Sequence, residues 1–175
     1  MIEKKLSSKR LYERDWMKID VDQVECINNV VSTKEIIRHP GATVILAIHN
    51  GRIIMEKQYR YAIGRYVYEL PAGKLNEGET PLVGAIREFE EECGYHATSM
   101  HSLGYFYPAF SYSDEIIHMF YTTEFTKTSQ HFDEDESIEV VELTLDEIEK
   151  MIEANEIFDA KTICVIHKYQ QIINK

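Results

Sequence analysis

The pattern of apolar and polar residues along the chain predicts several strands and a small number of helices. Residues 42–48 form an apolar run, and Asn50-Gly51 after it is a strong signal for a tight hairpin turn. The turn leads into a second predicted strand, residues 52–60. Shorter apolar or alternating segments predict the remaining strands, at residues 66–70, 100–107, 116–125 and 138–143. Together with the helices described next, these strands indicate an α/β (α+β) protein.

A helix is predicted to begin after Thr80. Thr80 can act as the N-cap, and Pro81 suits the first helical position because no hydrogen-bond partner is needed there. Gly94 is expected to end this helix. Its apolar residues recur at steps of four, three and four residues; they are Leu82, Ile86, Phe89 and Cys93. This spacing gives one face of an amphipathic helix, which we expect to pack against the core.

Two further helices are predicted near the end of the chain. Thr144 followed by Glu147 has the spacing of a capping box and opens a helix at residues 145–153. A last helix is predicted at about residues 159–173, where apolar residues gather along one side.

Residues 1–38 show a weaker alternation, which is typical of two or three strands in a small antiparallel sheet. The segment has few large apolar residues, so we expect it to pack on the remainder of the chain or on another subunit. We therefore divide the chain into an N-terminal strand segment, residues 1–38, and a main domain, residues 39–175.

The helix predicted after Thr80 carries three carboxylates on a second face. Glu88 and Glu92 lie four residues apart with Glu91 beside them, and like charges at this spacing repel by roughly 0.2–0.5 kcal/mol per pair. Gly84 falls on the same face, where its missing side chain would let a ligand approach. Hard cations such as Mg²⁺ take oxygen ligands, usually carboxylates together with substrate phosphates and waters. The cluster is a candidate metal site, and a solvated acidic helix face is the alternative.

Composition narrows the possible partners. The net charge of −11 argues against nucleic-acid binding through a broad basic surface, and an anionic substrate would need local cations such as metal ions. No segment approaches eighteen consecutive apolar residues, so we expect no membrane span, and the first ten residues lack the apolar region of a signal peptide. Cys26, Cys93 and Cys164 form no metal-ligand pattern. Free thiols and a cytoplasmic location are the plain interpretation.

The stretch from Gly73 to Tyr95 resembles the signature of the Nudix hydrolases. That signature reads glycine, five residues, glutamate, seven residues, Arg-Glu, an apolar residue, any residue, Glu-Glu, any residue, glycine, apolar residue. This chain supplies it with Gly73, Glu79, Arg87, Glu88, Phe89, Glu91, Glu92, Gly94 and Tyr95. The resemblance implies the Nudix fold, a mixed β-sheet sandwiched between α-helices, and hydrolysis of a nucleoside diphosphate linked to another group. We expect Glu79 and Arg87 to hold the loop and the helix together by an ion pair.

The resemblance also implies a set of metal ligands. Glu88 and Glu92 are expected to bind the metal, with Glu91 joining or bridging when more than one ion is bound. The family places the backbone carbonyl of the residue before the signature glycine, here Ala72, in the same coordination sphere. Mg²⁺ is the expected ion and Mn²⁺ the alternative. Such ions neutralise a diphosphate and lower the pKa of a bound water, so we count Glu92 among the catalytic residues as well.

Segments outside the signature are similar to the ADP-ribose pyrophosphatase branch of the family. They are residues 38–41, 57–60, 69–74 and 159–162. In that branch the products are AMP and ribose 5-phosphate, and the N-terminal sheet is commonly exchanged between two subunits, which implies a homodimer. The alternatives are a pyrophosphatase for another sugar nucleotide such as GDP-mannose, a hydrolase of nucleoside triphosphates or capped RNA, and a non-catalytic ADP-ribose sensor. Sensors usually lose signature glutamates, whereas this chain keeps them all.

One loop departs from the branch. Where Ser-Pro-Gly is usual, this chain has Ala109-Phe110-Ser111, which leaves the preferred diphosphate open. Phe110 is a candidate to stack against a sugar or a base, and a plug of the core is the alternative for a loop aromatic.

The remaining candidates are a general base and two substrate contacts. The acidic run at residues 133–136 is similar to a mobile loop that delivers a catalytic glutamate in the branch, with Glu134 the first choice and Glu136 the second; a solvated acidic loop is the alternative. Arg60 is a candidate phosphate contact because a guanidinium matches phosphate oxygens in two places. Glu69 is a candidate to hydrogen-bond the ribose or the base.

Overall fold

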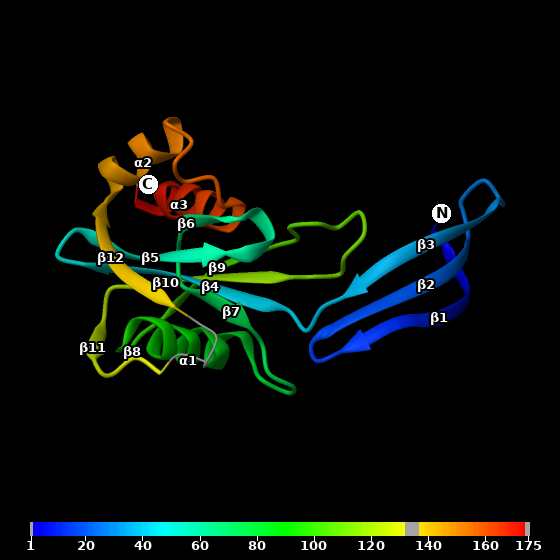
Figure 1. Ribbon diagram of the computed structural model, residues 1–175, viewed down its shortest axis with the longest axis horizontal. Coiled ribbons are helices and arrows are strands. Elements are labelled where there is room, and N and C mark those ends of the chain that lie inside the picture. Colours follow the sequence, from blue (N-terminus) through cyan, green and yellow to red (C-terminus); the bar gives the residue numbers. More distant parts are fainter. Residues whose placement is uncertain (1, 132–136, 174–175) are drawn as a thin grey trace. The chain divides into compact units, whose positions relative to one another are not determined.

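The computed structural model describes residues 2–131 and 137–173 (Figure 1). The chain forms two compact units, one made of Met1–Gly41 with Tyr107–Ile116 and the other of Ala42–Phe106 with Ile117–Lys175. The first unit therefore takes in a segment from much later in the chain, which the sequence pattern did not assign to it.

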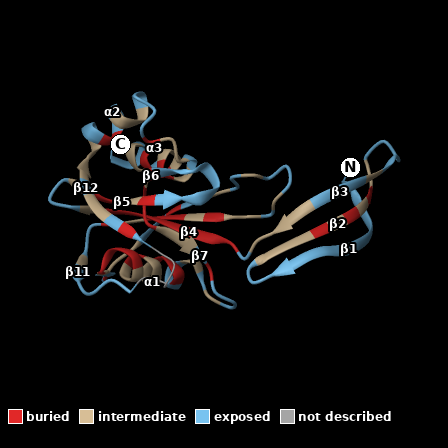
Figure 2. Cartoon of the chain, in the orientation of Figure 1, coloured by how far each residue is buried: buried red, intermediate tan, exposed pale blue. Residues whose placement is uncertain are grey.

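The N-terminal unit is built on a three-stranded antiparallel sheet in the order β1-β2-β3. Its strands are β1 (Lys4–Arg14), β2 (Met17–Glu25) and β3 (Val31–Arg38). Strand β1 is exposed along its whole length, whereas β2 buries alternate residues (Figure 2). The loop at residues 107–116 pairs with β3, because the Ile37 N–H donates to the Tyr112 carbonyl at 2.8 Å and the Asp114 N–H donates to the Ile37 carbonyl at 3.2 Å.

The main unit contains a seven-stranded mixed sheet whose principal order is β12-β5-β4-β10-β9, with β6 paired to β5 and β7 paired to β4. Its strands are β4 (Ala42–His49), β5 (Arg52–Arg60), β6 (Arg65–Glu69), β7 (Ala72–Lys74), β9 (His101–Phe106), β10 (Ile117–Thr122) and β12 (Ile138–Thr144). Strands β4 and β10 are parallel and the other pairs are antiparallel. A short 3₁₀ turn at Tyr61–Ile63 joins β5 to β6, and β8 (Tyr95–Ala97) pairs with β11 (Phe125–Lys127) in a separate small sheet.

Helices cover both faces of the mixed sheet (Figure 1). Val44 and Leu46 of β4 face a core shared with α2 and α3, whereas Ile45 and Ala47 face a second core shared with α1. A strand that is buried on both faces needs a continuous apolar run rather than an alternating one, and the run at β4 has that form. The predicted α/β class, with a mixed sheet between helices, is confirmed.

Helix α1 (Pro81–Cys93) begins and ends as predicted. The Thr80 side chain accepts a hydrogen bond from the Val83 N–H at 3.4 Å, and Gly94 closes the helix in the left-handed conformation with φ of 71°. The buried face is formed by Ala85, Phe89 and Cys93 together with Gly84 and Glu92. Leu82 is 44% exposed, so its predicted place on the apolar face was wrong.

Gly84, and not Leu82, is the buried residue of the first turn of α1. A Cβ at Gly84 would lie 2.6 Å from Cδ2 of Leu75 and 3.1 Å from Oε2 of Glu79. The helix therefore packs closely through Gly84 onto the loop that precedes it. This differs from the expectation that Gly84 leaves room for a ligand on the acidic face.

Helices α2 (Leu145–Glu153) and α3 (Ala160–Ile173) lie on the opposite face of the sheet. The capping box predicted at α2 is present, since Thr144 and Glu147 exchange side-chain and backbone hydrogen bonds. Within the described residues, none of the helices has both the length and the apolar character needed to cross a membrane.

Candidate active site

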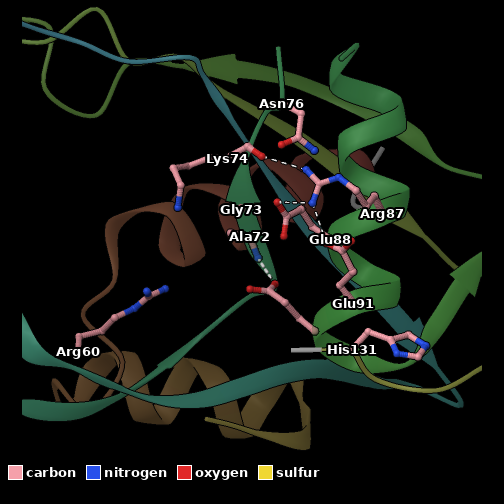
Figure 3. A pocket seen from close by; sticks show the side chains of 10 residues that line it. Arg60, Ala72, Gly73, Lys74, Asn76, Arg87, Glu88, Glu91 and His131 are labelled. Atoms are coloured by element: carbon pink, nitrogen blue, oxygen red, sulfur yellow. Dashed lines mark hydrogen bonds and ion pairs between the residues drawn. The ribbon is translucent and has the colours of Figure 1, made fainter. Parts of the chain in front are cut away.

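A cavity of about 190 Å³ opens between α1 and strand β7 in the main unit (Figure 3). It is lined by Arg60, Ala72, Gly73, Lys74, Asn76, Arg87, Glu88, Glu91, Glu92 and His131. The structure thus brings together five of the predicted metal ligands and substrate contacts, namely Glu88, Glu91, Glu92, Ala72 and Arg60.

Glu88 reaches across strand β7 because residue 73 is a glycine. A Cβ at Gly73 would lie 2.1–2.3 Å from the carboxyl atoms of Glu88, a distance at which the side chain could not stay in place. Burial raises the pKa of Glu88 above its ordinary value, and the neighbouring Arg87 partly offsets that effect. The glycine of the signature therefore makes room for the first carboxylate of the helix.

Glu92 is held at the other end of β7. Its side chain is buried, and its Oε2 accepts a hydrogen bond from the Ala72 N–H at 2.9 Å. This bond joins α1 to β7. It holds the Glu92 carboxylate beside the backbone of Ala72, whose carbonyl is the fourth expected metal ligand.

Arg87 organises the carboxylates on α1. Its Nε and Nη2 donate to the two carboxylate oxygens of Glu79 at 2.8 and 2.9 Å, and Nη2 also donates to the Lys74 carbonyl at 3.0 Å. Nη1 lies 2.9 Å from Glu88 and 2.7 Å from Glu91. The expected ion pair between Glu79 and Arg87 is present. Hydrogen bonding from Arg87 lowers the pKa of Glu79 to about 2.

The donor set fits a divalent cation. Three carboxylates and the carbonyl-bearing backbone of Ala72 surround one polar cavity, which is the oxygen chemistry that hard cations prefer. Among the residues that the structure describes, no three acidic, histidine or cysteine side chains already converge as a ready-made cage. Arg87 pairs with Glu88 and Glu91 instead, so these two carboxylates would have to turn toward an ion.

Arg60 enters the cavity from the end of β5 (Figure 3). Its Nε donates to Oε1 of Glu69 at 2.7 Å. Glu69 is buried, its second oxygen contacts the Lys161 ammonium, and it is not among the described residues that line the cavity. The structure therefore places Glu69 behind Arg60, in contact with two cations.

Sequence reasoning missed a buried carboxylate behind the cavity, Glu56. Burial raises its pKa to about 7, Glu69 adds to the effect, and the Cys93 thiol donates to its Oε1 at 3.3 Å. One signal was available in the sequence, since Glu56 directly follows the apolar run Ile53-Ile54-Met55 in β5.

His131 is a second residue that sequence reasoning missed. Residues 128–131 cap the end of α1 by donating three hydrogen bonds to the last carbonyls of the helix and its cap. The donors are, in this order, the Thr128 N–H, the His131 N–H and the side-chain amide of Gln130. The accepting carbonyls are those of Gly94 at 2.7 Å, Glu91 at 2.9 Å and Glu92 at 2.8 Å. Such carbonyls otherwise lack intrahelical partners. The chain is thereby fixed to α1 just before residue 132.

Besides Glu69, whose contact with the ribose or the base stays a prediction, three predicted residues are not placed in the cavity. Glu134 and Glu136 lie outside the described residues, so the role of either as a general base stays a prediction. Phe110 belongs to the N-terminal unit, where its side chain is 82% exposed. Its proposed contact with substrate also stays a prediction.

Comparison with known proteins gives consistent results. Residues 37–164 match the model of the NUDIX domain family. Over 171 residues the chain is 39% identical to the ADP-ribose pyrophosphatase of Bacillus subtilis (strain 168), an alignment that covers 96% of this chain and 92% of that protein. The methanol dehydrogenase activator of Bacillus methanolicus is similar to the same extent, with 39% identity and the same coverages. The crystal structure of an ADP compounds hydrolase matches the fold with a TM-score of 0.88, 18% identity and coverage of 99% of this chain and 95% of that one.

A mixed sheet between helix layers, with a carboxylate-lined cavity on the helix of the signature, defines a hydrolase of the Nudix class. The family match covers most of the chain and includes every residue of the signature. The chain belongs to the Nudix family and is a Nudix hydrolase.

Proposed function

We propose that the protein hydrolyses the pyrophosphate bond of a nucleoside diphosphate sugar, and that ADP-ribose is its preferred substrate. Water adds across the bridge between the two phosphorus atoms, so the products are AMP and ribose 5-phosphate. The observation that carries the proposal is a single cavity with Glu88, Glu91 and Glu92 on one wall and Arg60 on another. The similarity to an ADP-ribose pyrophosphatase supports the choice of substrate.

The proposed metal ligands are Glu88, Glu92 and the carbonyl of Ala72, with Glu91 joining when a second ion binds. Mg²⁺ is the expected ion and Mn²⁺ the alternative. When bound, such an ion supplies charge neutralisation of the diphosphate and a bound water of lowered pKa. Arg87 would then release Glu88 and Glu91 while it keeps Glu79 and the Lys74 carbonyl.

The other roles belong to protein groups around the diphosphate. The guanidinium of Arg60, whose Nε is bound by Glu69, would contact a phosphate through its terminal nitrogens. Glu134 is proposed as the general base, with Glu136 as the alternative. Phe110 is proposed to stack against the sugar or the base, and Glu69 to act on the substrate through Arg60.

We further propose that the protein is a cytoplasmic homodimer that exchanges its N-terminal sheets and binds neither nucleic acid nor membrane. The exposed strand β1 supports exchange, since an eleven-residue strand that the described part of the chain leaves exposed throughout is an open surface for pairing or packing. The three free cysteines support a reducing compartment.

A substrate panel tests the proposed specificity. Release of the nucleoside monophosphate (AMP or GMP) is measured with Mg²⁺ and equal concentrations of ADP-ribose, GDP-mannose and NADH. We expect the highest kcat/KM for ADP-ribose. Preference for another diphosphate would keep the mechanism and assign specificity to Phe110 and its neighbours. Binding of ADP-ribose with no turnover of any compound would support a sensor instead.

A second candidate role is activation of a dehydrogenase, which the equal similarity to the methanol dehydrogenase activator favours. The test is the rate of methanol oxidation by a methanol dehydrogenase before and after addition of this protein. A rate increase that Glu92→Gln abolishes would assign both roles to the same cavity, and an unchanged rate would dismiss this candidate.

A further inference from the structure

The first turn of α3 is fixed to the end of strand β6. Oγ1 of Thr162 accepts a hydrogen bond from the Leu70 N–H at 2.9 Å. The same hydroxyl donates to Oδ2 of Asp159 at 2.7 Å, and that oxygen also accepts from the Thr162 N–H at 3.0 Å. These bonds leave little freedom to the two residues between Asp159 and Thr162 on this turn, the second of which is Lys161.

Lys161 is a lysine with little access to water. Its side chain is only 16% exposed, and its ammonium contacts Oε2 of Glu69 and lies 3.1 Å from Oδ1 of Asp159. Burial disfavours the charged form, but the two carboxylates outweigh that effect and raise the pKa of Lys161 above its ordinary value. The side chain is therefore an ammonium at neutral pH.

Glu69 lies between this ammonium and the guanidinium of Arg60. Its side chain is 3% exposed, and each of its oxygens contacts a different cation. Among the described residues, the guanidinium of Arg60 is bound through Nε alone, and 45% of its side chain remains exposed at the cavity. A carboxylate with both oxygens available instead commonly accepts two parallel hydrogen bonds from a guanidinium.

We propose that Lys161 is a positioning residue for the diphosphate. By occupying Oε2 of Glu69, it restricts Arg60 to a single bond through Nε and keeps the terminal nitrogens of Arg60 directed toward the substrate phosphate. Its charge also offsets that of Glu69, so the cavity keeps the attraction of Arg60 for an anion. This inference rests on the proposed function in that it requires a phosphate to bind at Arg60.

The test begins with Lys161→Met, which keeps most of the side-chain volume and removes the charge. We expect KM for ADP-ribose to rise about tenfold, the order expected for weakening one hydrogen bond to a charged group, while kcat changes less than about threefold. Lys161→Arg should keep KM within about threefold of the wild-type value because a cation still meets Oε2. Lys168→Met, which removes an exposed lysine from the same helix, should leave KM unchanged.

A double-mutant cycle with Arg60→Ala separates positioning from a structural role. If Lys161 acts through Arg60, then Lys161→Met adds nothing to KM in the Arg60→Ala background. Equal, multiplicative effects of Lys161→Met in both backgrounds would overturn the inference. If Lys161→Met fails to fold, Glu69→Gln combined with Lys161→Met removes both buried charges. Its KM is then expected near the wild-type value, and a KM as high as that of Arg60→Ala would overturn the inference.

The same cycle can be measured without turnover. Calorimetric titration with ADP and Mg²⁺ gives a Kd for a diphosphate in each variant. A wild type that binds ADP but does not hydrolyse ADP-ribose would refute the proposed function, and a non-additive cycle in Kd would still uphold the role of Lys161. Hydrolysis of ADP-ribose by the wild type, together with an additive cycle in Kd, would uphold the proposed function and refute the role of Lys161.

Discussion

Gly73 shows at the scale of one residue how a missing side chain shapes the cavity. The carboxyl of Glu88 lies where a Cβ of residue 73 would be, and only glycine leaves that space. The contact is with the far end of a flexible side chain rather than with backbone. A larger residue at this position would therefore displace Glu88 without preventing the fold.

We predict that Gly73→Ala lowers kcat by about 100-fold, the order found when one charge-stabilising group of an active site is removed. The thermal unfolding midpoint should change by only a few degrees, roughly equivalent to 1 kcal/mol or less. Steady-state kinetics and a melting curve measure both effects. Full activity in this variant would show that Glu88 does not need its observed position.

The bidentate pair of Glu79 and Arg87 gives a second prediction at this scale. Because the pKa of folded Glu79 is about 2, below its ordinary value, its contribution to stability is full above about pH 4.5 and is lost as the pH falls toward 2. Glu79→Gln should cost about 2 kcal/mol of unfolding free energy at pH 7, as for a hydrogen bond to a charged group. Urea unfolding at pH 7 and pH 3 checks this, and an equal cost at both values would contradict it.

At the scale of elements, the parts predicted from the sequence are those with a strong local signal. The hairpin of β4 and β5 follows from Asn50-Gly51, and α1 and α2 follow from their caps at Thr80 and Thr144. The short strands β7, β8 and β11 were missed, because three residues carry no period and each strand exists only through its partner. The predicted strand at residues 116–125 is shorter in the structure, where β10 ends at Thr122.

The site residues divide in the same way, into those with a strong local signal in the sequence and those brought together by the fold. The three α1 glutamates that line the cavity, Glu88, Glu91 and Glu92, were found because they share one helix face and match a signature. Glu56 and His131 were missed, and Lys161 was named only within the segment 159–162 and given no role. These residues reach the region of the cavity from β5, a loop and α3, so their proximity to it is a product of tertiary packing. No periodicity within one element can indicate such a meeting.

Glu56 on β5 gives a prediction for an element that carries a buried acid. The pKa of folded Glu56, about 7, lies above its ordinary value. Its favourable contribution to the free energy of unfolding is therefore full below about pH 4.5 and is lost as the pH rises to about 7. In the Glu56→Gln variant, the free energy of unfolding should not show this fall with pH, which amounts to at most about 3 kcal/mol in the wild type. Denaturant unfolding at pH 5 and pH 8 measures the difference. A variant that is less stable than wild type by the same amount at both values would contradict the prediction.

At the scale of the whole molecule, the N-terminal unit has an internal frame of its own. Arg38 contacts Asp20 at 3.0 Å, Asp22 at 3.2 Å and Asp114 at 3.1 Å, and so joins the sheet to the loop at residues 107–116. Strand β1 remains exposed along its whole length in a single chain. A unit with these internal ion pairs and an exposed edge strand is suited to an exchange between two copies.

We predict that sedimentation equilibrium gives a mass of twice the 20.5 kDa of one chain. The dimer is expected because exchange would cover apolar side chains on β1, such as Leu11, which is 64% exposed. Leu11→Lys should shift the equilibrium toward the monomer, and Lys9→Ala serves as a control on the same strand. A wild-type mass of one chain at micromolar concentration would contradict the proposed exchange.

The central claim is that the carboxylates of α1 form the active site of a pyrophosphatase. The most direct measurement is AMP release from ADP-ribose with Mg²⁺ by wild type, Glu92→Gln and Glu90→Gln, the last of which changes a glutamate that pairs with His96 and does not line the cavity. We predict that Glu92→Gln lowers kcat by at least about 100-fold and that Glu90→Gln stays within about threefold of wild type. Equal activities of the three proteins would contradict the account.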